Sequence, residues 1–386
     1  PSTVSLLDPN FKNPQTWKTS LAADFKLGNG WIFSMEGIFN KDVNTAFFTN
    51  PNLVAPQALN VAGYPDNRMI YPATNTTKFI NPLTTAGQAS PTGNQAFNAI
   101  VLGNGKQGYY ASLTLKLEKQ FRNGFSGAVA YTKSQSANLF DGSGDQPLSA
   151  WQGTANVNGS NFAQLGYAGF VTPDRVIAYF SYRKEYFKHL ATTISMVYEG
   201  GIQGRFSYTY SADINRDGTN FDLIYIPKDQ TEIDFVPLTT NGVTYTAQQQ
   251  KDLFFAYIDQ DRYLRKHKGQ YAERNGAQIP WRNQLDAKFM QDLFVNLGKN
   301  RNSVQFTIDV FNLGNLLNPS WGKIKTINAS SILVPQNQAS LVAGGTVRPT
   351  FRLATDRGNP ITTTFRDNVS TASTYSIQFG IRYIFN

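Results

Sequence analysis

Nine segments of this chain alternate apolar and polar residues with a period of two, which is the pattern of a β-strand with two unlike faces. They are residues 16–27, 31–40, 109–121, 125–136, 175–186, 190–199, 281–293, 303–313 and 375–385. In the last segment every residue of one register is aromatic or aliphatic, while the other register is mostly polar or small. Strands of soluble proteins average about five or six residues. These longer segments are therefore expected to cross a bilayer when tilted.

The polar register of these segments predicts a wall with one wet side. If the apolar register faces lipid, the opposite register faces a watery interior. We expect eight charged residues there: Asp24, Glu36, Lys116, Glu118, Asp286, Lys288, Asp309 and Arg382. Acid–base catalysis by the carboxylates of this set is the alternative to a hydrated wall, and we favour the hydrated wall.

The lengths of the connections indicate how the strands are arranged. Short connections at 28–30, 122–124, 187–189 and 298–302 alternate with long ones at 43–108, 137–174, 200–280 and 314–374. Transmembrane barrels have tight turns on the periplasmic side and long loops on the extracellular side, whereas compact soluble domains carry few loops this long. The sequence therefore predicts an all-β fold, an antiparallel transmembrane barrel, with 200–280 as a large extracellular loop.

The number of predicted strands indicates whether the chain can form a closed barrel alone. Bacterial single-chain barrels have an even number of strands, and an open sheet edge in lipid leaves backbone groups unpaired. Nine segments do not satisfy this rule. We therefore expect residues 1–386 to be the C-terminal part of a larger barrel. Pro1 does not begin a signal peptide, which fits a mature or truncated chain.

Composition narrows the class further. Aromatic residues make up 13% and charged residues only 16%, where about a quarter is usual in soluble proteins. No run of 18 apolar residues exists, so a membrane-spanning helix is not expected. There is no cysteine. The net charge of +9 is either a scattered surface bias or an attraction to outer-membrane lipid and lipopolysaccharide. Because Lys and Arg are dispersed, a nucleic-acid partner is not expected.

A run of acidic and amide residues in the third long connection carries the sharpest local motif. Oxygen-bearing side chains alternate from 213 to 217 and are followed by Gly218, as at the start of a calcium-binding loop. The twelfth position is Ile224 rather than Glu. The expected ligands are Asp213, Asn215, Asp217, the carbonyl of Thr219 and Asp222. A structural Ca²⁺ is therefore predicted, with a surface turn rich in Asp and Asn as the alternative.

The same connection contains a predicted helix. Residues 246–267 place apolar side chains at helical spacing. That face is expected to pack on the loop rather than on a partner.

Catalysis has little support in the sequence. The two histidines, His189 and His267, have no metal-ligand spacing. No nucleophile and base pattern is evident, so we do not expect an enzyme.

The closing segment resembles the last strand of outer-membrane β-barrels. That strand presents a polar residue, a glycine and two aromatic residues to the barrel-insertion machinery. The matching positions are Gln378, Gly380, Tyr383 and Phe385. Asn386 follows the final aromatic residue, which departs from the usual ending. The resemblance implies that this segment is the assembly signal.

Three further stretches, 213–227, 263–276 and 309–318, together with Trp321-Gly322, resemble the Oar-like subgroup of TonB-dependent outer-membrane receptors. The likeness is weakest in 45–106 and 336–368. It implies a barrel of 22 strands, of which these nine would be strands 14 to 22, and a plug domain and TonB box outside this chain. The implied function is energised passage of a bulky solute, with the TonB complex as partner through the plug. A surface lipoprotein or protein is a further implied partner.

Two other functions are compatible with the pattern. A passive porin or a surface adhesin barrel would share the strands but lack a plug. A soluble calcium-binding β-sandwich, such as a carbohydrate-binding module, would share the alternation and the acidic motif. Uptake, export and adhesion all remain open within the resemblance.

Overall fold

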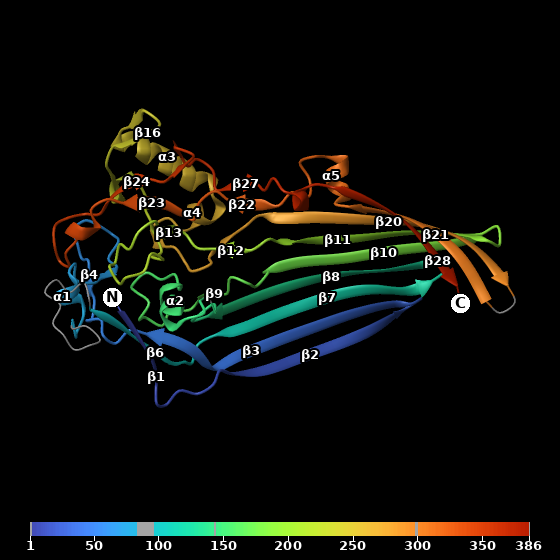
Figure 1. Ribbon diagram of the computed structural model, residues 1–386, viewed down its shortest axis with the longest axis horizontal. Coiled ribbons are helices and arrows are strands. Elements are labelled where there is room, and N and C mark those ends of the chain that lie inside the picture. The colour runs from blue at the N-terminus through green and yellow to red at the C-terminus, as the bar shows by residue number, and fades with distance from the viewer. Residues whose placement is uncertain (1, 83–95, 143, 298–299, 386) are drawn as a thin grey trace.

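The computed structural model describes residues 2–82, 96–142, 144–297 and 300–385. It contains one large sheet, here called the wall, and four long connections folded together at one end of it, here called the cap (Figure 1). Among the described residues, the cap comprises 50–82, 96–108, 139–142, 144–173, 203–280 and 312–375. Short turns join the strands at the other end of the wall. This division follows the predicted alternation of short and long connections.

All nine predicted strands are present. They are β2 (Gln15–Gly28), β3 (Trp31–Thr49), β7 (Tyr109–Arg122), β8 (Phe125–Asn138), β10 (Asp174–Tyr186), β11 (Leu190–Ile202), β20 (Trp281–Leu297), β21 (Asn300–Phe311) and β28 (Ser376–Phe385). Each pairs antiparallel with the next in this order. The largest difference from prediction is β3. Its last residues pair with β6 (Phe97–Gly105) in place of β7, so the strand extends beyond residue 40 into the cap.

The short turns have the backbone that tight hairpins require. Asn123 and Gly124 link Arg122 to its partner Phe125, and both have positive φ, at 54° and 81°. Positive φ at both central residues matches the right-handed twist of the flanking strands. A Cβ at position 124 would also lie 2.1 Å from the Arg183 carbonyl oxygen. Of the fourth predicted turn, 298–302, residues 298 and 299 lie outside the described residues.

The two faces of the wall differ in polarity across its whole width. Paired residues of an antiparallel sheet point to the same face. One continuous row of pairs is Phe125, Tyr182, Ile194, Phe289, Ile308 and Phe379. The eight residues predicted to line a lumen all share the opposite face. Within the described residues, no helix has the length and apolar character needed to span a membrane.

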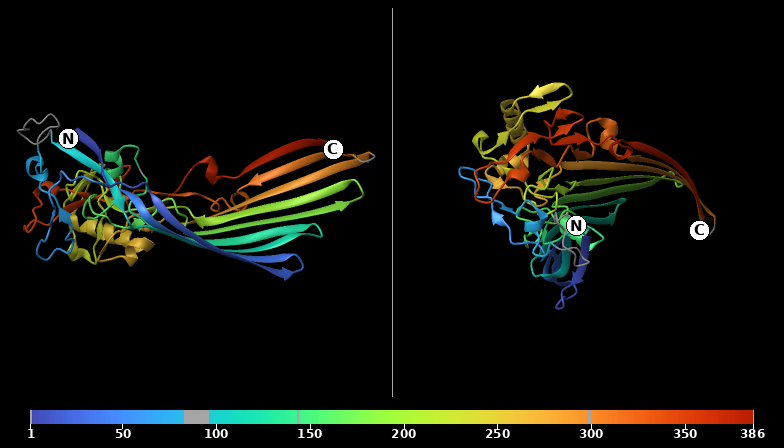
Figure 2. Two further views of the ribbon diagram at one scale, coloured as in Figure 1. Left: turned by 90° about the horizontal axis from the view of Figure 1, so that it is seen from below. Right: turned by 60° about the vertical axis from the view of Figure 1, so that its left-hand side comes forward.

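The wall is curved but not closed (Figure 2). Within the described residues, β2 pairs only with β3, and β28 pairs only with β21. Both outer edges of the wall therefore present unpaired backbone groups. The nine wall strands therefore form an open sheet, as expected for part of a larger barrel.

The cap is assembled from short elements. Its strands are β4 (Gln57–Ala58), β5 (Met69–Ile70), β6, β9 (Gly166–Tyr167), β12 (Arg205–Phe206), β13 (Thr209–Tyr210), β14 (Tyr225–Ile226), β15 (Asp234–Phe235), β16 (Leu238–Thr240), β17 (Val243–Tyr245), β18 (Gln270–Tyr271), β19 (Ala277–Gln278), β22 (Lys325–Ile327), β23 (Ser331–Pro335), β24 (Thr350–Leu353), β25 (Thr355–Asp356), β26 (Asn359–Pro360) and β27 (Phe365–Asp367). Its helices are α1 (Asn75–Lys78), α2 (Pro147–Gln152), α3 (Ala247–Gln260), α4 (Arg262–Lys266) and α5 (Leu313–Leu317). The N-terminal strand β1 (Ser2–Leu7) adds to β6 in parallel.

The predicted helix at 246–267 is present as two helices. Thr246 begins α3 with a capping box, because its side chain accepts from the Gln249 N–H while Gln249 reaches back to the Thr246 N–H. The helix ends at Asp261, which caps α4 by accepting from the N–H groups of Tyr263 and Leu264. The apolar face packs inside the cap, with Phe254 and Leu264 buried.

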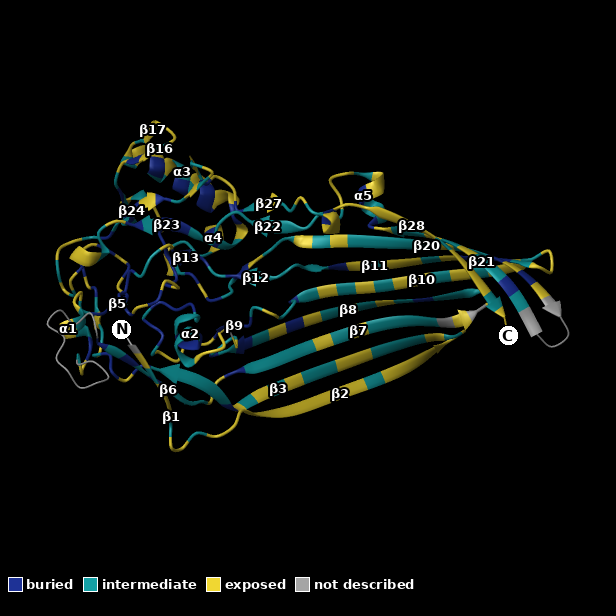
Figure 3. Cartoon of the chain, viewed as in Figure 1, coloured by how far each residue is buried: buried dark blue, intermediate teal, exposed yellow. Residues whose placement is uncertain are grey.

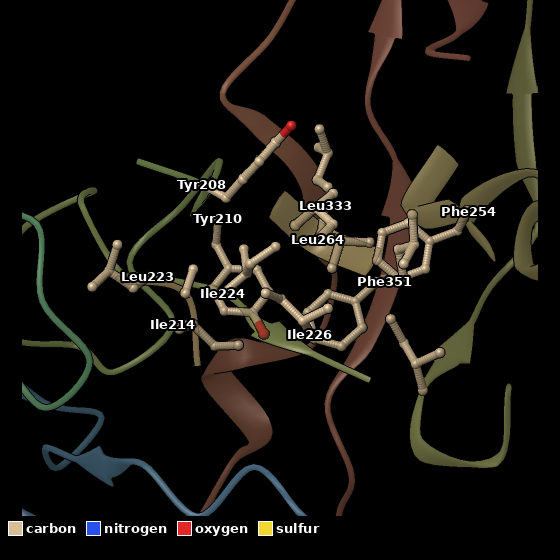
Figure 4. Packing of buried hydrophobic residues seen from close by; sticks show 14 of the residues in the cluster. Tyr208, Tyr210, Ile214, Leu223, Ile224, Ile226, Phe254, Leu264, Leu333 and Phe351 are labelled. Carbon is tan, nitrogen blue, oxygen red and sulfur yellow. The ribbon is translucent and has the colours of Figure 1, made fainter. Parts of the chain in front are cut away.

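The main hydrophobic core of the molecule lies in the cap and not in the wall (Figures 3 and 4). All four long connections contribute to it. Figure 4 shows Tyr208, Tyr210, Ile224, Phe254, Leu264, Leu333 and Phe351 gathered in one cluster. The Tyr210 and Phe351 rings stack with centroids 5.4 Å apart. Each large apolar side chain buried in this way contributes about 1.5–3 kcal/mol. The cap is therefore a folded unit and not a set of loose loops.

Candidate functional site

The inner face of the wall carries paired charges. The eight predicted residues all lie on this face, five of them with polar partners and three of them exposed. Lys116 pairs with Glu118, and Lys288 lies 2.9 Å from Asp309 on the neighbouring strand. Asp286 accepts from the Asn312 N–H and from the Gln284 amide. The remaining three, Asp24, Glu36 and Arg382, are exposed. Such a face is polar and mixed in charge, and it can contact a polar solute along the length of the wall.

A groove of about 560 Å³ lies where this inner face meets the cap. Three charged side chains of the wall line it: Arg175, Glu199 and Arg282. Arg175 donates to Glu199 with a distance of 2.7 Å between Nη2 and Oε1. The cap supplies Gln203 and Lys325 from two different connections. Guanidinium groups are donors suited to carboxylate or sugar oxygens. Here the Arg282 guanidinium also donates to the Gly322 and Ala372 carbonyl groups, and the Gln203 amide donates to the Pro280 carbonyl.

Sequence reasoning did not identify this groove. Arg175, Glu199 and Arg282 all lie at the cap ends of their strands on the polar register, so the alternation contained part of the signal. The contribution of Lys325 depends on how the last connection folds back over the wall. No local pattern in the sequence reports that.

The predicted calcium loop, 213–222, lies inside the cap between β13 and β14. Its carboxylates and amide fold the loop onto itself. Asn215 Oδ1 accepts from the Asp217 N–H and Asp217 Oδ1 accepts from the Thr219 N–H, each at 2.8 Å. Asp213 Oδ2 accepts from the Gly218 N–H, also at 2.8 Å. Asp222 Oδ2 accepts from the Ile214 N–H at 2.8 Å. These are the bonds of an Asx-rich turn, the stated alternative, and they also place side-chain oxygens close together.

Several oxygens of this loop are buried and have no hydrogen-bond partner in the described part of the chain. They are Asp213 Oδ1, Thr219 Oγ1 and Asp222 Oδ1. Burial and the neighbouring charge of Asp217 raise the pKa of Asp213 to about 7. Burial also raises the pKa values of Asp217 and Asp222 above their ordinary range. An ionised carboxylate in such surroundings is costly unless a cation offsets it.

The three carboxylates do not by themselves form a ligand cluster. Among the described residues, no group of three His, Cys, Asp or Glu side chains is placed to hold one metal ion. Ca²⁺ takes six to eight oxygen ligands and accepts amide, carbonyl and hydroxyl oxygens as readily as carboxylates. The loop fits a calcium ion only through such a mixed set, with Asn215, Thr219 and backbone carbonyl groups beside the carboxylates.

Other connections hold this loop in place, and sequence reasoning missed them. The Arg216 guanidinium donates to the carbonyl oxygens of Tyr71, Gln338 and Leu341. Ser160 N–H donates to Asp217 Oδ2 at 3.0 Å. Lys78 Nζ donates to the Arg216 carbonyl at 3.0 Å. Lys78 is therefore a positive charge beside the loop, and it can offset the charge of the loop carboxylates in place of a metal ion.

The four residues of the predicted assembly signal lie on β28 at the edge of the wall. Gln378 and Gly380 are on the inner face and Tyr383 and Phe385 on the outer face. A Cβ at position 380 would lie 2.6 Å from Thr307 Oγ1 of the neighbouring strand. The Tyr383 and Phe385 rings are exposed and 5.9 Å apart. Asn386 lies outside the described residues.

The fold and its two unlike faces define a wall of a transmembrane β-barrel with a large folded cap. A family profile described as an outer membrane beta barrel domain matches residues 1–340. The chain belongs to this family of outer membrane beta barrel domains. It is accordingly an outer-membrane protein that crosses the membrane several times with strands. This location excludes the soluble β-sandwich. Comparisons with curated proteins and with solved structures found no match.

Proposed function

We propose that this chain forms part of the barrel wall and the extracellular cap of a TonB-dependent receptor of the Oar-like subgroup. The supporting observation is the combination of an unclosed wall and a cap whose core draws on all four long connections. In this proposal further strands pair with β2 and β28 to complete 22 strands, because an open edge in lipid is unstable. The chain itself catalyses no reaction.

The solute would enter through the cap and pass along the charged inner face. The groove lined by Arg175, Glu199 and Arg282 is the first part of that face that a solute leaving the cap would meet. A plug domain, moved by the TonB complex, would control the passage. The outer surface of the cap is available to a surface lipoprotein or another protein partner, because loops on a rigid scaffold commonly carry recognition.

Two measurements test the transport proposal. The full-length receptor, with the plug domain and TonB box that the proposal places outside residues 1–386, is reconstituted in planar bilayers, and its binding to the periplasmic domain of TonB is measured by calorimetry. A plugged receptor is expected to show TonB binding and no steady conductance. Steady conductance without TonB binding would instead establish the passive porin, and neither property would favour the adhesin.

We also propose that loop 213–222 binds one structural calcium ion. The buried oxygens without partners support it, and the positive charge of Lys78 opposes it. The test is Asp217→Ala with limited proteolysis near residue 220. Calcium should protect the unaltered protein and not the variant. Lys78→Gln should leave the protection by calcium intact or increase it. Identical digestion with and without calcium would remove the metal from the proposal.

The edge strand β28 is proposed as the segment that the barrel-insertion machinery binds. Tyr383 and Phe385 are accessible on the outer face, and the outer edge of β28 is unpaired within the described residues. Tyr383→Ala with Phe385→Ala should slow insertion, measured as the rate at which the protein acquires protease resistance in the membrane. Unchanged insertion would contradict this role.

A further inference from the structure

A second groove, of about 710 Å³, lies where the cap meets the outer face of the wall. The wall contributes Tyr131, Asp174, Ile202 and Trp281, and all four lie on the same register as the apolar row described above. The cap contributes α4 and the segment before β20. This groove therefore opens on the lipid side of the wall, whereas the groove at Arg175 opens on the inner side.

The lower part of the groove is aromatic and aliphatic. Tyr131 and Trp281 line it together with Ile279 and Pro280. The Trp281 indole N–H donates to Asn283 Oδ1 at 2.9 Å, and the Tyr131 hydroxyl donates to Asp174 Oδ1 at 2.5 Å. Rings with an apolar body and a polar tip favour the boundary between hydrocarbon and headgroups. The position of these rings sets the groove at headgroup level.

The upper part of the groove carries positive charge that the protein leaves unmatched. Arg262 and Lys266 both line it, and their spacing of four places them on one side of α4. Both are exposed, and among the residues that the structure describes neither side chain makes a hydrogen bond or an ion pair. Other cations of this region are engaged. Lys268 pairs with Asp259, and Arg265 donates to the Asp259 carbonyl.

The two acidic residues that line the groove do not cancel this charge. Asp174 is paired with Lys133 at 3.0 Å. Asp261 is buried, and its carboxylate accepts four hydrogen bonds, from Tyr263 N–H, Leu264 N–H, the Tyr208 hydroxyl and the Thr364 hydroxyl. The free positive charge facing the groove is therefore that of Arg262 and Lys266. His267, which also lines the groove, lies 3.6 Å from the Glu273 carboxylate.

We propose that this groove binds a phosphate-bearing glycolipid of the outer leaflet, with Arg262 and Lys266 on the headgroup phosphate and the acyl chains along Trp281 and Tyr131. The complementary charge and the continuity of the groove with the lipid-facing wall both select a lipid. A soluble anion would gain nothing from the apolar floor. The site depends on the location in the outer membrane and is independent of TonB-driven transport.

The experiment is a lipid titration of the detergent-solubilised protein followed by native mass spectrometry. The probe is lipid A with its phosphates intact. Arg262→Gln with Lys266→Gln should weaken binding about thirtyfold, because each basic residue near an anionic lipid surface contributes about fivefold. The matched control is Lys228→Gln with Arg265→Gln, which removes the same charge from exposed positions that do not line the groove. The control should bind as the unaltered protein does.

Three further arms distinguish the sources of the effect. Lipid A without phosphates should bind the unaltered protein as weakly as intact lipid A binds the groove variant. Inorganic phosphate at millimolar concentration should not displace the lipid. The conservative exchange Arg262→Lys with Lys266→Arg should retain binding, which separates charge from misfolding. Equal binding by the groove variant and the unaltered protein would overturn the proposal, and so would displacement by inorganic phosphate.

Discussion

The wall and the cap of this protein use the same kinds of side chain in opposite ways. Phe379 of β28 is 75% exposed, whereas Phe351 of β24 is 1% exposed. In the wall, apolar residues point out and depend on lipid to cover them. In the cap, apolar residues from four distant segments cover one another. The apolar side chains of the wall are therefore removed from water by the membrane, and those of the cap by packing against one another.

Because of this difference, we expect substitutions that add or remove polar groups to have different effects in the wall and in the cap. A wall strand alternates, so its own sequence decides which side chains meet lipid, while its backbone hydrogen bonds go to the neighbouring strands. The cap has buried polar groups that need partners from elsewhere in the chain. Arg68, for example, is fully buried with Asp66, and its Nη2 donates to the Leu223 carbonyl, 155 residues away. Removing a partner should therefore cost more in the cap, and inserting a charge should cost more on the outer wall.

The largest expected effect is in the cap core. Phe351→Ala should destabilise the cap by about 3–5 kcal/mol, because it empties a buried site stacked on Tyr210. The matched change in the wall, Phe379→Ala, should cost far less. The free energy of unfolding in urea, followed by protease cleavage within the cap, measures the difference. Equal losses for the two variants would mean that the cap has no core of its own.

A charge placed on the outer wall should have the next largest effect. Leu115 pairs with Met35 and Tyr131 on the lipid-facing register. Leu115→Arg should destabilise the inserted barrel by about 1–2 kcal/mol, between the values for Arg at the bilayer midplane and at the interface, because Leu115 is paired with Tyr131 toward the headgroup level. Phe306→Arg, on a second strand of the same face, should behave alike.

The control for this change is the neighbouring residue Thr114, which lies on the inner face and pairs with Glu36. Thr114→Arg should be tolerated, because that face is wet and an acidic residue is adjacent. Barrel yield in the outer membrane, measured by heat-modifiable migration on gels, separates the two outcomes. If Thr114→Arg were as damaging as Leu115→Arg, the assignment of the two faces would be wrong.

A smaller effect is expected at the edge of the wall. Gly380→Ala would bring a methyl group within 2.6 Å of Thr307 Oγ1 unless that side chain rotates. We expect a loss of about 1 kcal/mol in the free energy of unfolding. Thr307→Ala should restore stability to Gly380→Ala, since it removes the obstacle. The double-mutant cycle in urea measures this, and purely additive losses would show that the contact is not the cause.

Sequence reasoning predicted the wall well because each strand carries its own period, and all nine strands are where that period placed them. It missed the end of β3, where the pairing partner changes from β7 to β6. It found the helix near 246–267 and the acidic motif, since both are local. It did not find the groove at Arg262 and Lys266, because only the fold brings α4 against Tyr131 and Trp281. Contacts such as Ser160 with Asp217 likewise have no local signal.

A change of pH should alter the stability of loop 213–222 in the cap. The pKa of Asp213 is raised to about 7, so the folded cap holds that proton more tightly than the unfolded chain does. Without calcium, the stability contributed by this group is greatest below about pH 4 and is lost as pH rises to about 7. A bound calcium ion needs the ionised carboxylate, so its protection should grow over the same range.

We therefore expect calcium to slow cleavage near residue 220 about tenfold more at pH 8 than at pH 5. The rates are measured by limited proteolysis with calcium and with a chelator at each pH. Asp213→Asn should reduce the loss of stability with pH, to which Asp217 and Asp222 also contribute, and should remove most of the protection, because the amide neither titrates nor attracts the ion as a carboxylate does. Protection that is equal at the two pH values would mean that calcium acts elsewhere, and the buried carboxylates would then be held by Lys78 and the backbone alone.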